Sequence, residues 1–130
     1  MIDRAAHPVG EPVDLAPRHY GPGGHYARLE DWLARCAGDF GFFRPYDRDR
    51  GGVQPEPWHL SYAPVAVPAL AALDAVMLER ALAGSGIAGW EEIRRQLAAL
   101  HARYVAAVAE PSGAVLAAVA SGFSPAARPA

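Results

Sequence analysis

The distribution of proline and glycine constrains the fold of this chain more than any other feature. The sequence has 12 prolines and 13 glycines, and most of both stand before residue 66. Proline fixes a backbone angle and removes a hydrogen-bond donor, so residues 1–24, which are dense in both residue types, cannot form a long helix. Beyond Pro64, alanine, leucine and charged residues dominate. We therefore expect loops, short strands and one helix in the first half, and helices in the second.

Apolar residues at helical three- and four-residue steps predict three helices. The first covers residues 25–37, between Gly24 and Gly38. The other two cover residues 67–83 and 90–109, and the glycines between them predict a helical hairpin. Because alanine supplies much of the 52% hydrophobic content, we expect tryptophan, tyrosine, phenylalanine and leucine to form the core.

The aromatic segment 40–46 and the alternating segment 58–62 flank a polar turn at residues 47–52. This order predicts an antiparallel hairpin with a wide loop, and hence the α+β class. After Pro111 the residues are small and interrupted by proline, which predicts a flexible tail. The expected organisation is a core over 1–66, a helical hairpin packed on it over 67–110, and a tail over 111–130.

Charge and hydropathy exclude several classes of partner. With 12 basic and 14 acidic residues, the net charge of −2 gives no field that attracts nucleic acid. The apolar run 114–120 is far shorter than the roughly 20 residues of a membrane-spanning helix, so we expect no membrane span. Residues 1–10 contain no apolar run typical of a signal peptide. Localisation stays open between the cell envelope or periplasm and the cytoplasm.

Glu56 and His59 are the clearest candidates for catalytic or metal-binding residues. Histidine is the commonest zinc ligand, and a carboxylate beside it can take a proton from water that zinc has acidified and return it to a leaving amine. Spacing alone does not establish this role, because Pro57 prevents a simple helical turn in which both side chains share a face. The alternative is that the two residues only cap and pack. For His19, His25 and His101 an ordinary structural role is favoured.

Three segments in fixed order resemble a known family of enzymes. They are residues 41–46 (GFFRPY), 51–53 (GGV) and 56–62 (EPWHLSY). This series is similar to the end of the D-alanyl-D-alanine carboxypeptidase family typified by VanY, and the resemblance runs from about Tyr20 to Pro64. It implies a zinc metallopeptidase that hydrolyses peptidoglycan stem peptides. The implied fold is a small antiparallel sheet of the D-Ala-D-Ala carboxypeptidase/hedgehog type, incomplete in this chain.

The resemblance assigns roles to individual residues. Glu56 corresponds to the family's general base, and His59 corresponds to the last of three protein ligands of zinc. Trp58 and Tyr62 correspond to wall or packing residues, and they are candidates for substrate binding.

The family's other two ligands come from a segment of the form Ser-x-His-x-x-Gly-x-Ala-x-Asp. Residues 5–14 match its His, Gly and Asp spacings, so His7 and Asp14 are the candidate metal ligands. Ala5 and Pro12 depart from the pattern. In a competing alignment, residues 3–24 form the loop after this segment, and the true ligands precede a chain that is N-terminally truncated. Both alignments stay open.

A substrate that ends in a carboxylate needs a cationic anchor near the metal. Arg44, Arg48 and Arg50 surround the expected hairpin. Arg44 stands between aromatic residues and is the preferred candidate, whereas Arg48 and Arg50 alternate with aspartates in a turn that is expected to be solvated and self-paired.

The sequence therefore leaves two alternative functions open. The first is a zinc D,D-carboxypeptidase acting on a peptidoglycan-derived peptide. The second is a catalytically incomplete remnant that binds a peptide or protein through its aromatic cleft and alanine-rich helices. A purely helical interaction domain ranks last, because it leaves the aromatic hairpin unexplained.

Overall fold

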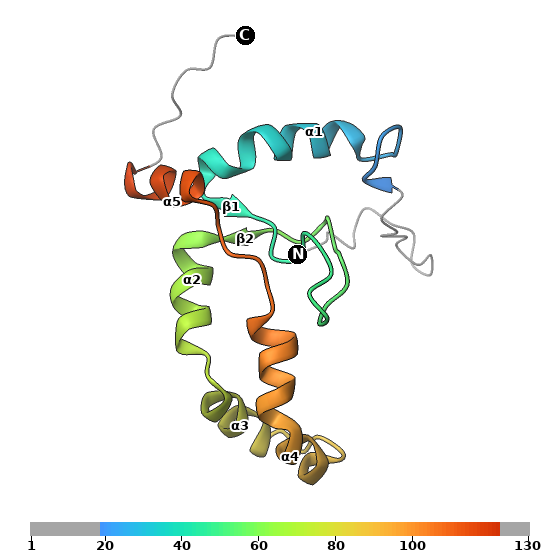
Figure 1. Ribbon diagram of the computed structural model, residues 1–130, viewed down its shortest axis with the longest axis vertical. Helices are drawn as coiled ribbons and strands as arrows, with labels where there is room; N and C mark the ends of the chain where they lie inside the picture. Colours follow the sequence, from blue (N-terminus) through green and yellow to red (C-terminus); the bar gives the residue numbers. More distant parts are fainter. Residues whose placement is uncertain (1–18, 123–130) are drawn as a thin grey trace.

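The computed structural model describes residues 19–122 (Figure 1). Five α-helices and one two-stranded antiparallel sheet lie within this range, which confirms the α+β class. The helical elements and strands follow in the order α1 (Ala27–Cys36), η3 (Ala37–Phe40), β1 (Phe42–Phe43), β2 (Ser61–Tyr62), α2 (Ala63–Ala72), α3 (Ala75–Ala83), α4 (Trp90–His101), η4 (Ala102–Ala106) and α5 (Gly113–Ala120).

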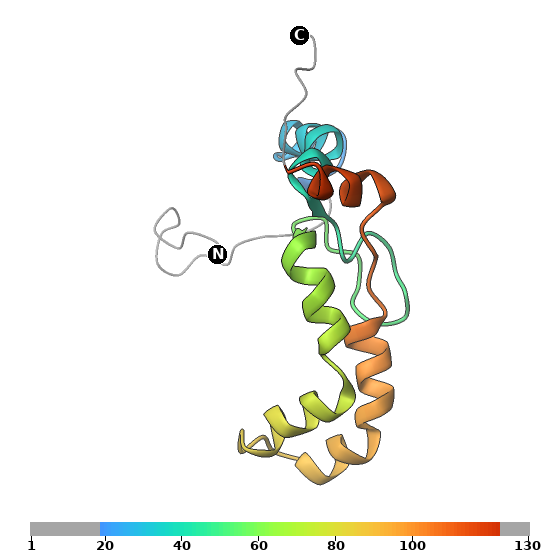
Figure 2. The same cartoon turned by 90° about the vertical axis from the view of Figure 1, so that its left-hand side faces the viewer.

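The described part of the chain is elongated. Figure 1 and Figure 2 show α1, the two strands and α5 at one end, with α3 and α4 at the opposite end. Helix α2 leads away from the strands, and α3 packs against α4 at the far end. Within the described residues, no helix combines the length and the apolar character needed to cross a membrane.

The two strands form the expected hairpin with a wide loop. Phe42 pairs with Tyr62 and Phe43 pairs with Ser61, in antiparallel register. The rings of Phe42 and Tyr62 lie 5.1 Å apart between centroids, a cross-strand contact that stabilises so short a ladder. Residues 44–60 connect the strands without any helix or strand of their own.

Helix α1 agrees with the prediction for residues 25–37. The helix continues into the 3-10 turn η3, and Gly41 ends that turn in the left-handed conformation at φ 78°. A residue with a side chain adopts this conformation at a cost, so glycine is the natural terminator here. The Trp32 ring stacks on Phe40 at 6.1 Å.

The single helix predicted for residues 67–83 is wrong, because the chain forms α2 and α3 instead. Helix α2 starts earlier, with Pro64 in its first turn, where a missing amide proton costs nothing. It ends at Leu73 (φ −81°, ψ 85°), and Asp74 begins α3 by accepting a hydrogen bond from the Met77 amide at 2.7 Å. Asp74 is therefore the N-cap of a new helix, and a prediction based on the spacing of apolar residues does not detect such a cap.

Helix α4 begins at Trp90, where the third predicted helix (90–109) begins, but it ends at His101, and the π-helical turn η4 follows it. Nε2 of His101 lies 2.6 Å from the carbonyl oxygen of Leu73. This contact joins the end of α4 to the end of α2, which is the ordinary structural role expected for His101.

Helix α5 contradicts the prediction of a flexible tail that begins at residue 111. Ser112 caps the helix by accepting a hydrogen bond from the Val115 amide at 3.3 Å. The helix packs on η3, and Val115 is buried there beside Gly38. Alanine and leucine favour helix, and packing stabilises a segment that is too short to be helical alone. Residues 123–130 lie outside the described range, and the proposed domain boundaries stay predictions.

The prediction of a core made of bulky side chains is wrong for the described residues. The buried apolar residues are mostly small, whereas Trp32, Phe40 and Phe42 are all more than one-third exposed. Small side chains occupy the points where elements cross, since they allow two backbones to approach closely. The buried set is Ala37, Ala63, Leu97, Ala109 and Val115.

The cap at Asp74 gives a test of the break between α2 and α3. We expect Asp74→Ala to lower the free energy of unfolding by about 1 kcal/mol, because the Met77 amide loses its acceptor. Asp74→Asn keeps an accepting oxygen and should retain most of that stability. Urea unfolding measures both, with the exposed Asp31→Ala in α1 as the control. Equal losses from Asp74→Ala and Asp31→Ala would contradict the capping role.

Candidate functional site

Glu56 and His59 lie on a tight turn within the loop 44–60. The His59 amide donates to the carbonyl oxygen of Glu56 at 3.1 Å, so residues 56–59 form a reverse turn. Pro57 occupies its second position, where the fixed φ of proline is favoured. The turn therefore places the two side chains together, although proline excludes the helical arrangement that their spacing first suggests.

The two side chains are in direct contact. Nδ1 of His59 lies 2.5 Å from Oε2 of Glu56. The side chain of His59 is 52% exposed and that of Glu56 is 26% exposed, so water reaches both groups. Nε2 of His59 makes no hydrogen bond to any residue in the described range. A carboxylate that holds one ring nitrogen orients the imidazole and leaves the other nitrogen available to a ligand.

Tyr46 supports this pair from the start of the loop. Its carbonyl oxygen accepts a hydrogen bond from the Glu56 amide at 3.0 Å. Its ring meets the His59 ring edge to face, with centroids 5.4 Å apart and an interplanar angle of 84°. Tyr46 thus holds the backbone of Glu56 and packs against the imidazole ring of His59.

Aromatic side chains border the pair on the other side. The Trp58 ring lies 6.2 Å from that of His59 and 5.6 Å from that of Tyr20. Tyr20 also contacts Tyr26 at 4.9 Å. Burial raises the pKa of the Tyr20 hydroxyl, and the neighbouring Tyr26 and Glu30 raise that pKa further. Tyr20 and Tyr26 are not among the residues predicted for the site, and their aromatic character before the first helix is the only signal in the sequence that points to them.

Arg44, the predicted substrate anchor, already has an acidic partner. Its Nη2 lies 2.6 Å from Oε2 of Glu30 in α1, and both side chains are mostly buried, with exposures of 27% and 15%. The ion pair joins α1 to the end of β1. A substrate carboxylate at Arg44 would therefore have to share the guanidinium with Glu30.

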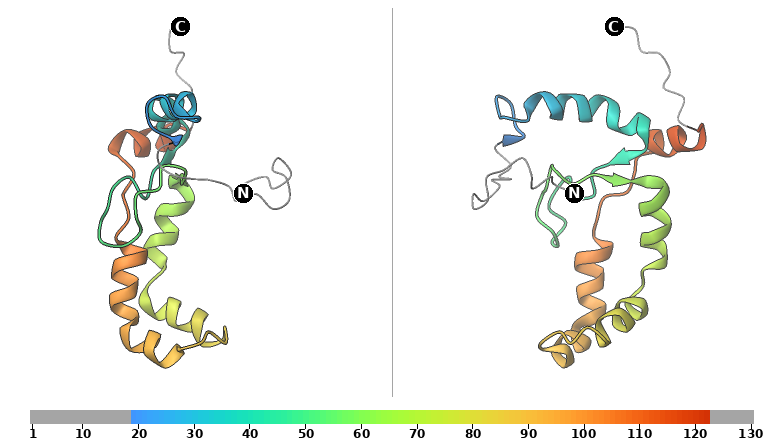
Figure 3. Two further views of the ribbon diagram at one scale, coloured as in Figure 1. Left: turned by 90° about the vertical axis from the view of Figure 1, so that its right-hand side faces the viewer. Right: turned by 180° about the vertical axis from the view of Figure 1, so that it is seen from behind.

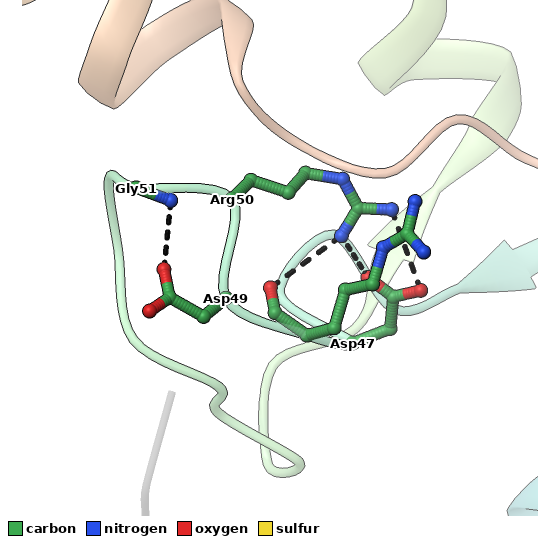
Figure 4. A network of polar contacts seen from close by, with 5 residues as sticks. Asp47, Asp49, Arg50 and Gly51 are labelled. Carbon is green, nitrogen blue, oxygen red and sulfur yellow. Dashed lines mark hydrogen bonds and ion pairs between the residues drawn. The ribbon is translucent and has the colours of Figure 1, made fainter.

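The polar turn at the start of the loop is self-paired at Arg50, as the sequence predicts (Figure 4). Arg50 contacts the carboxylate of Asp47, and Oδ1 of Asp49 accepts a hydrogen bond from the Gly51 amide at 2.7 Å. The hydrogen bond from Arg50 is the main cause that lowers the pKa of Asp47. Arg50 is thereby engaged within the turn.

The remaining predicted residues are distributed as follows. Tyr62 lies in β2, paired with Phe42, and not on the loop that carries Glu56 and His59. His7 and Asp14 lie outside the described residues, so their role as metal ligands stays a prediction.

The described residues contain no complete set of zinc ligands. Among residues 19–122, no three histidine, cysteine, aspartate or glutamate side chains lie together as metal ligands would. Hydrolytic zinc sites use three protein ligands and an open position. The exposed imidazole of His59 suits one ligand and the contacting carboxylate suits a base, and a zinc site that used them would need two further ligands from outside the described range.

An apolar cavity of about 740 Å³ adjoins the hairpin. Its walls come from the hairpin, α2, η4, α5 and the segment before α5, and Tyr46 belongs to both this cavity and the Glu56–His59 site. Residues that line it include Phe43, Tyr46, Leu70, Tyr104, Val108 and Leu116.

Comparison with known proteins identifies the family. The family model described as VanY, D-alanyl-D-alanine carboxypeptidase, matches residues 4–65. An uncharacterized protein of Haemophilus influenzae is 30% identical over 107 residues, which cover 81% of this chain and 82% of that protein. The chain belongs to the VanY family. No solved structure gives a significant match.

Membership in the VanY family relates the site to carboxypeptidase-type hydrolases. The matched segment contains the Glu56–His59 turn, Arg44 and both ligand candidates that lie outside the described residues, His7 and Asp14. It ends near the start of α2, whereas the alignment with the Haemophilus influenzae protein is long enough to extend into the helical half.

The raised pKa of Tyr20 predicts how stability depends on pH. Folding favours the neutral hydroxyl, so its contribution to stability is fully present below the unfolded pKa of about 10 and is lost as pH rises through the higher folded pKa. We expect Tyr20→Phe to reduce the loss of stability in alkaline solution. Urea unfolding at neutral and alkaline pH measures this difference. An identical alkaline loss in the wild type and Tyr20→Phe would show that another group is responsible.

Proposed function

We propose that this protein is a zinc-dependent D-alanyl-D-alanine carboxypeptidase that hydrolyses peptidoglycan stem peptides. The observation that carries the proposal is the contact between Glu56 and His59 on an exposed turn inside the segment that matches the VanY family. The family is one of carboxypeptidase-type hydrolases, and the substrate and the metal are the parts that we propose here.

The proposed chemistry assigns a separate task to each residue. Zinc, when bound, supplies Lewis acidity and makes water a stronger acid. His59 is proposed as one zinc ligand, with His7 and Asp14 as the others. Glu56, whose carboxylate contacts Nδ1 of the imidazole in the metal-free protein, is proposed to accept a proton from water and to return it to the leaving amine.

The proposed substrate contacts come from the residues around this turn. Trp58 and Tyr62 provide an aromatic wall, and Arg44 provides positive charge for the terminal carboxylate of the peptide. Because Arg44 contacts Glu30, we expect it to bind the substrate carboxylate more weakly than an unpaired arginine would.

A second candidate is a catalytically incomplete member of the family that binds a peptide or protein. Its supporting observation is that the described residues bring no three potential metal ligands together. Exposed apolar side chains on α2, such as Val65 at 64% exposure, also suit a binding surface.

Metal content and hydrolysis separate these two functions. For the enzyme we expect about one zinc per chain by elemental analysis, as the three-ligand site requires. His59→Ala should lose the metal. Glu56→Gln should keep it, yet hydrolyse a D-Ala-D-Ala-terminated peptide roughly 10²- to 10⁴-fold more slowly, because the proton acceptor is gone.

Two further variants complete the experiment. His101→Gln removes an imidazole that contacts Leu73 and should leave the zinc content unchanged. His7→Ala and Asp14→Ala should each lose zinc if residues 5–14 supply the other ligands. A folded wild-type protein that binds no zinc would contradict the proposed enzyme and favour the binding module.

A further inference from the structure

The loop that carries Glu56 and His59 is held at two points by one distant segment. At its base, the Ala109 amide donates to the carbonyl oxygen of Pro45 at 2.8 Å, and both residues are buried. At its tip, Nε of Arg103 donates to the carbonyl oxygen of Gly51 at 2.5 Å. Figure 2 and Figure 3 show the loop reaching the end of the α4 and η4 arm. Residues 103–109 therefore brace a loop that has no regular secondary structure.

The contact at the tip requires a glycine at position 52. A Cβ atom on Gly52 would lie 2.0 Å from the carbonyl oxygen of Arg103 and 3.1 Å from its carbonyl carbon. These are backbone atoms, so a rotamer change cannot relieve the clash. Gly52 is thus the residue that lets the loop lie directly against the backbone of η4.

The side chain of Arg103 is held between two partners. Its guanidinium lies 5.1 Å from the centroid of the Tyr104 ring, within range of a cation–π interaction, while its Nε contacts Gly51. Arg103 belongs to the π-helical turn η4, and such turns frequently occur at functional sites. The turn interrupts the regular helix at the place where the chain meets the loop.

Both attachments act on the Glu56–His59 pair. The base attachment at Pro45 immediately precedes Tyr46, whose carbonyl oxygen and ring support Glu56 and His59. The tip attachment at Gly51 and Gly52 lies shortly before Glu56 in the chain. Sites that perform chemistry need such support, since a displacement of about 1 Å is enough to impair them.

We propose that Arg103 is a positioning residue for the Glu56–His59 pair, acting through its contact with the Gly51–Gly52 tip of the loop. Its effect on metal binding rests on the proposed zinc function. Its effect on the geometry of the pair does not, because that geometry belongs to the metal-free protein.

The first test removes the contact between Arg103 and Gly51 by changing Arg103 in η4. Arg103→Met keeps the length of the side chain and removes the donor, whereas Arg103→Lys restores a donor that can reach the Gly51 carbonyl. Arg35→Met is the matched control, because Nε of Arg35 also donates to a backbone carbonyl, that of Asp31 at 3.0 Å, but far from the loop. Both substituted positions, Arg103 and Arg35, are exposed, so the three variants should fold like the wild type.

The readout is the nitrogen NMR signal of the His59 ring in metal-free protein, which reports the hydrogen bond from Nδ1 to Glu56. We expect this signal to broaden or shift in Arg103→Met, and to persist in Arg103→Lys and Arg35→Met. Zinc affinity, measured by competition with a chromogenic chelator, should fall roughly 10-fold in Arg103→Met alone, as for other residues that support a metal ligand.

The second test acts from the side of the loop. Gly52→Ala forces the tip away from Arg103 and should change the His59 signal in the same way, although Arg103 itself is intact. Gly84→Ala is its control, because a Cβ atom there meets nothing within 4 Å and the backbone has φ −92°. Gly52→Ala also gives an answer if Arg103→Met does not fold.

The outcomes separate the inference from the proposed function. Unchanged His59 signals in both Arg103→Met and Gly52→Ala would overturn the positioning role, whatever the zinc affinity. Wild-type protein that binds no zinc would overturn the proposed enzyme, while a His59 signal that depends on Arg103 and Gly52 would still support the positioning role.

Discussion

The structure depends on how a long loop without regular secondary structure is held in place. Residues 44–60 leave and rejoin a sheet in which each strand has two residues, so the ladder fixes only the ends of the loop. The hydrogen bond between the buried residues Ala109 and Pro45 holds the loop at a further point, beyond the end of β1. Because the amide and the carbonyl are both buried, leaving either without its partner would be costly. The arrangement of the loop therefore follows from a segment that comes more than 40 residues later in the chain.

Small residues make this arrangement possible. Ala37, Ala63 and Ala109 are buried where elements cross, and Gly52 lies against the backbone of Arg103. Large side chains at these points would separate the elements. Several bulky aromatic residues are instead exposed, and some of them contact one another, as Trp32 does with Phe40. Apolar burial per residue is modest in such a structure, so contacts between backbones carry more of its specificity than a large core does.

The residues proposed for catalysis and the residues that support them come from different parts of the chain. The segment that matches the VanY family ends at residue 65 and contains the Glu56–His59 turn. The residues that hold this turn in position, Arg103 and Ala109, lie in the helical half beyond that segment. The C-terminal helices thus have a defined structural relation to the site.

Local sequence patterns determined the elements whose cause is local. The apolar spacing around Trp32 gives α1, the aromatic segments around Phe42 and Tyr62 give the hairpin, and the resemblance to the family predicts roles for Glu56 and His59. The capping residues Asp74 and Ser112 are also visible in the sequence. The spacing of apolar residues nevertheless predicted one continuous helix across Asp74, and the proline content predicted a flexible tail across Ser112.

Only the tertiary structure decided the contacts between distant residues. It paired Arg44 with Glu30, placed Tyr20 beside Trp58, and brought Arg103 to Gly51. No periodicity marks these pairs, because each joins segments whose separation in the chain is unrelated to any helical or strand repeat. The sequence by itself therefore predicted which groups carry the proposed chemistry, and the packing of the helical half decided how those groups are held, since that packing depends on contacts between segments that are distant in the chain.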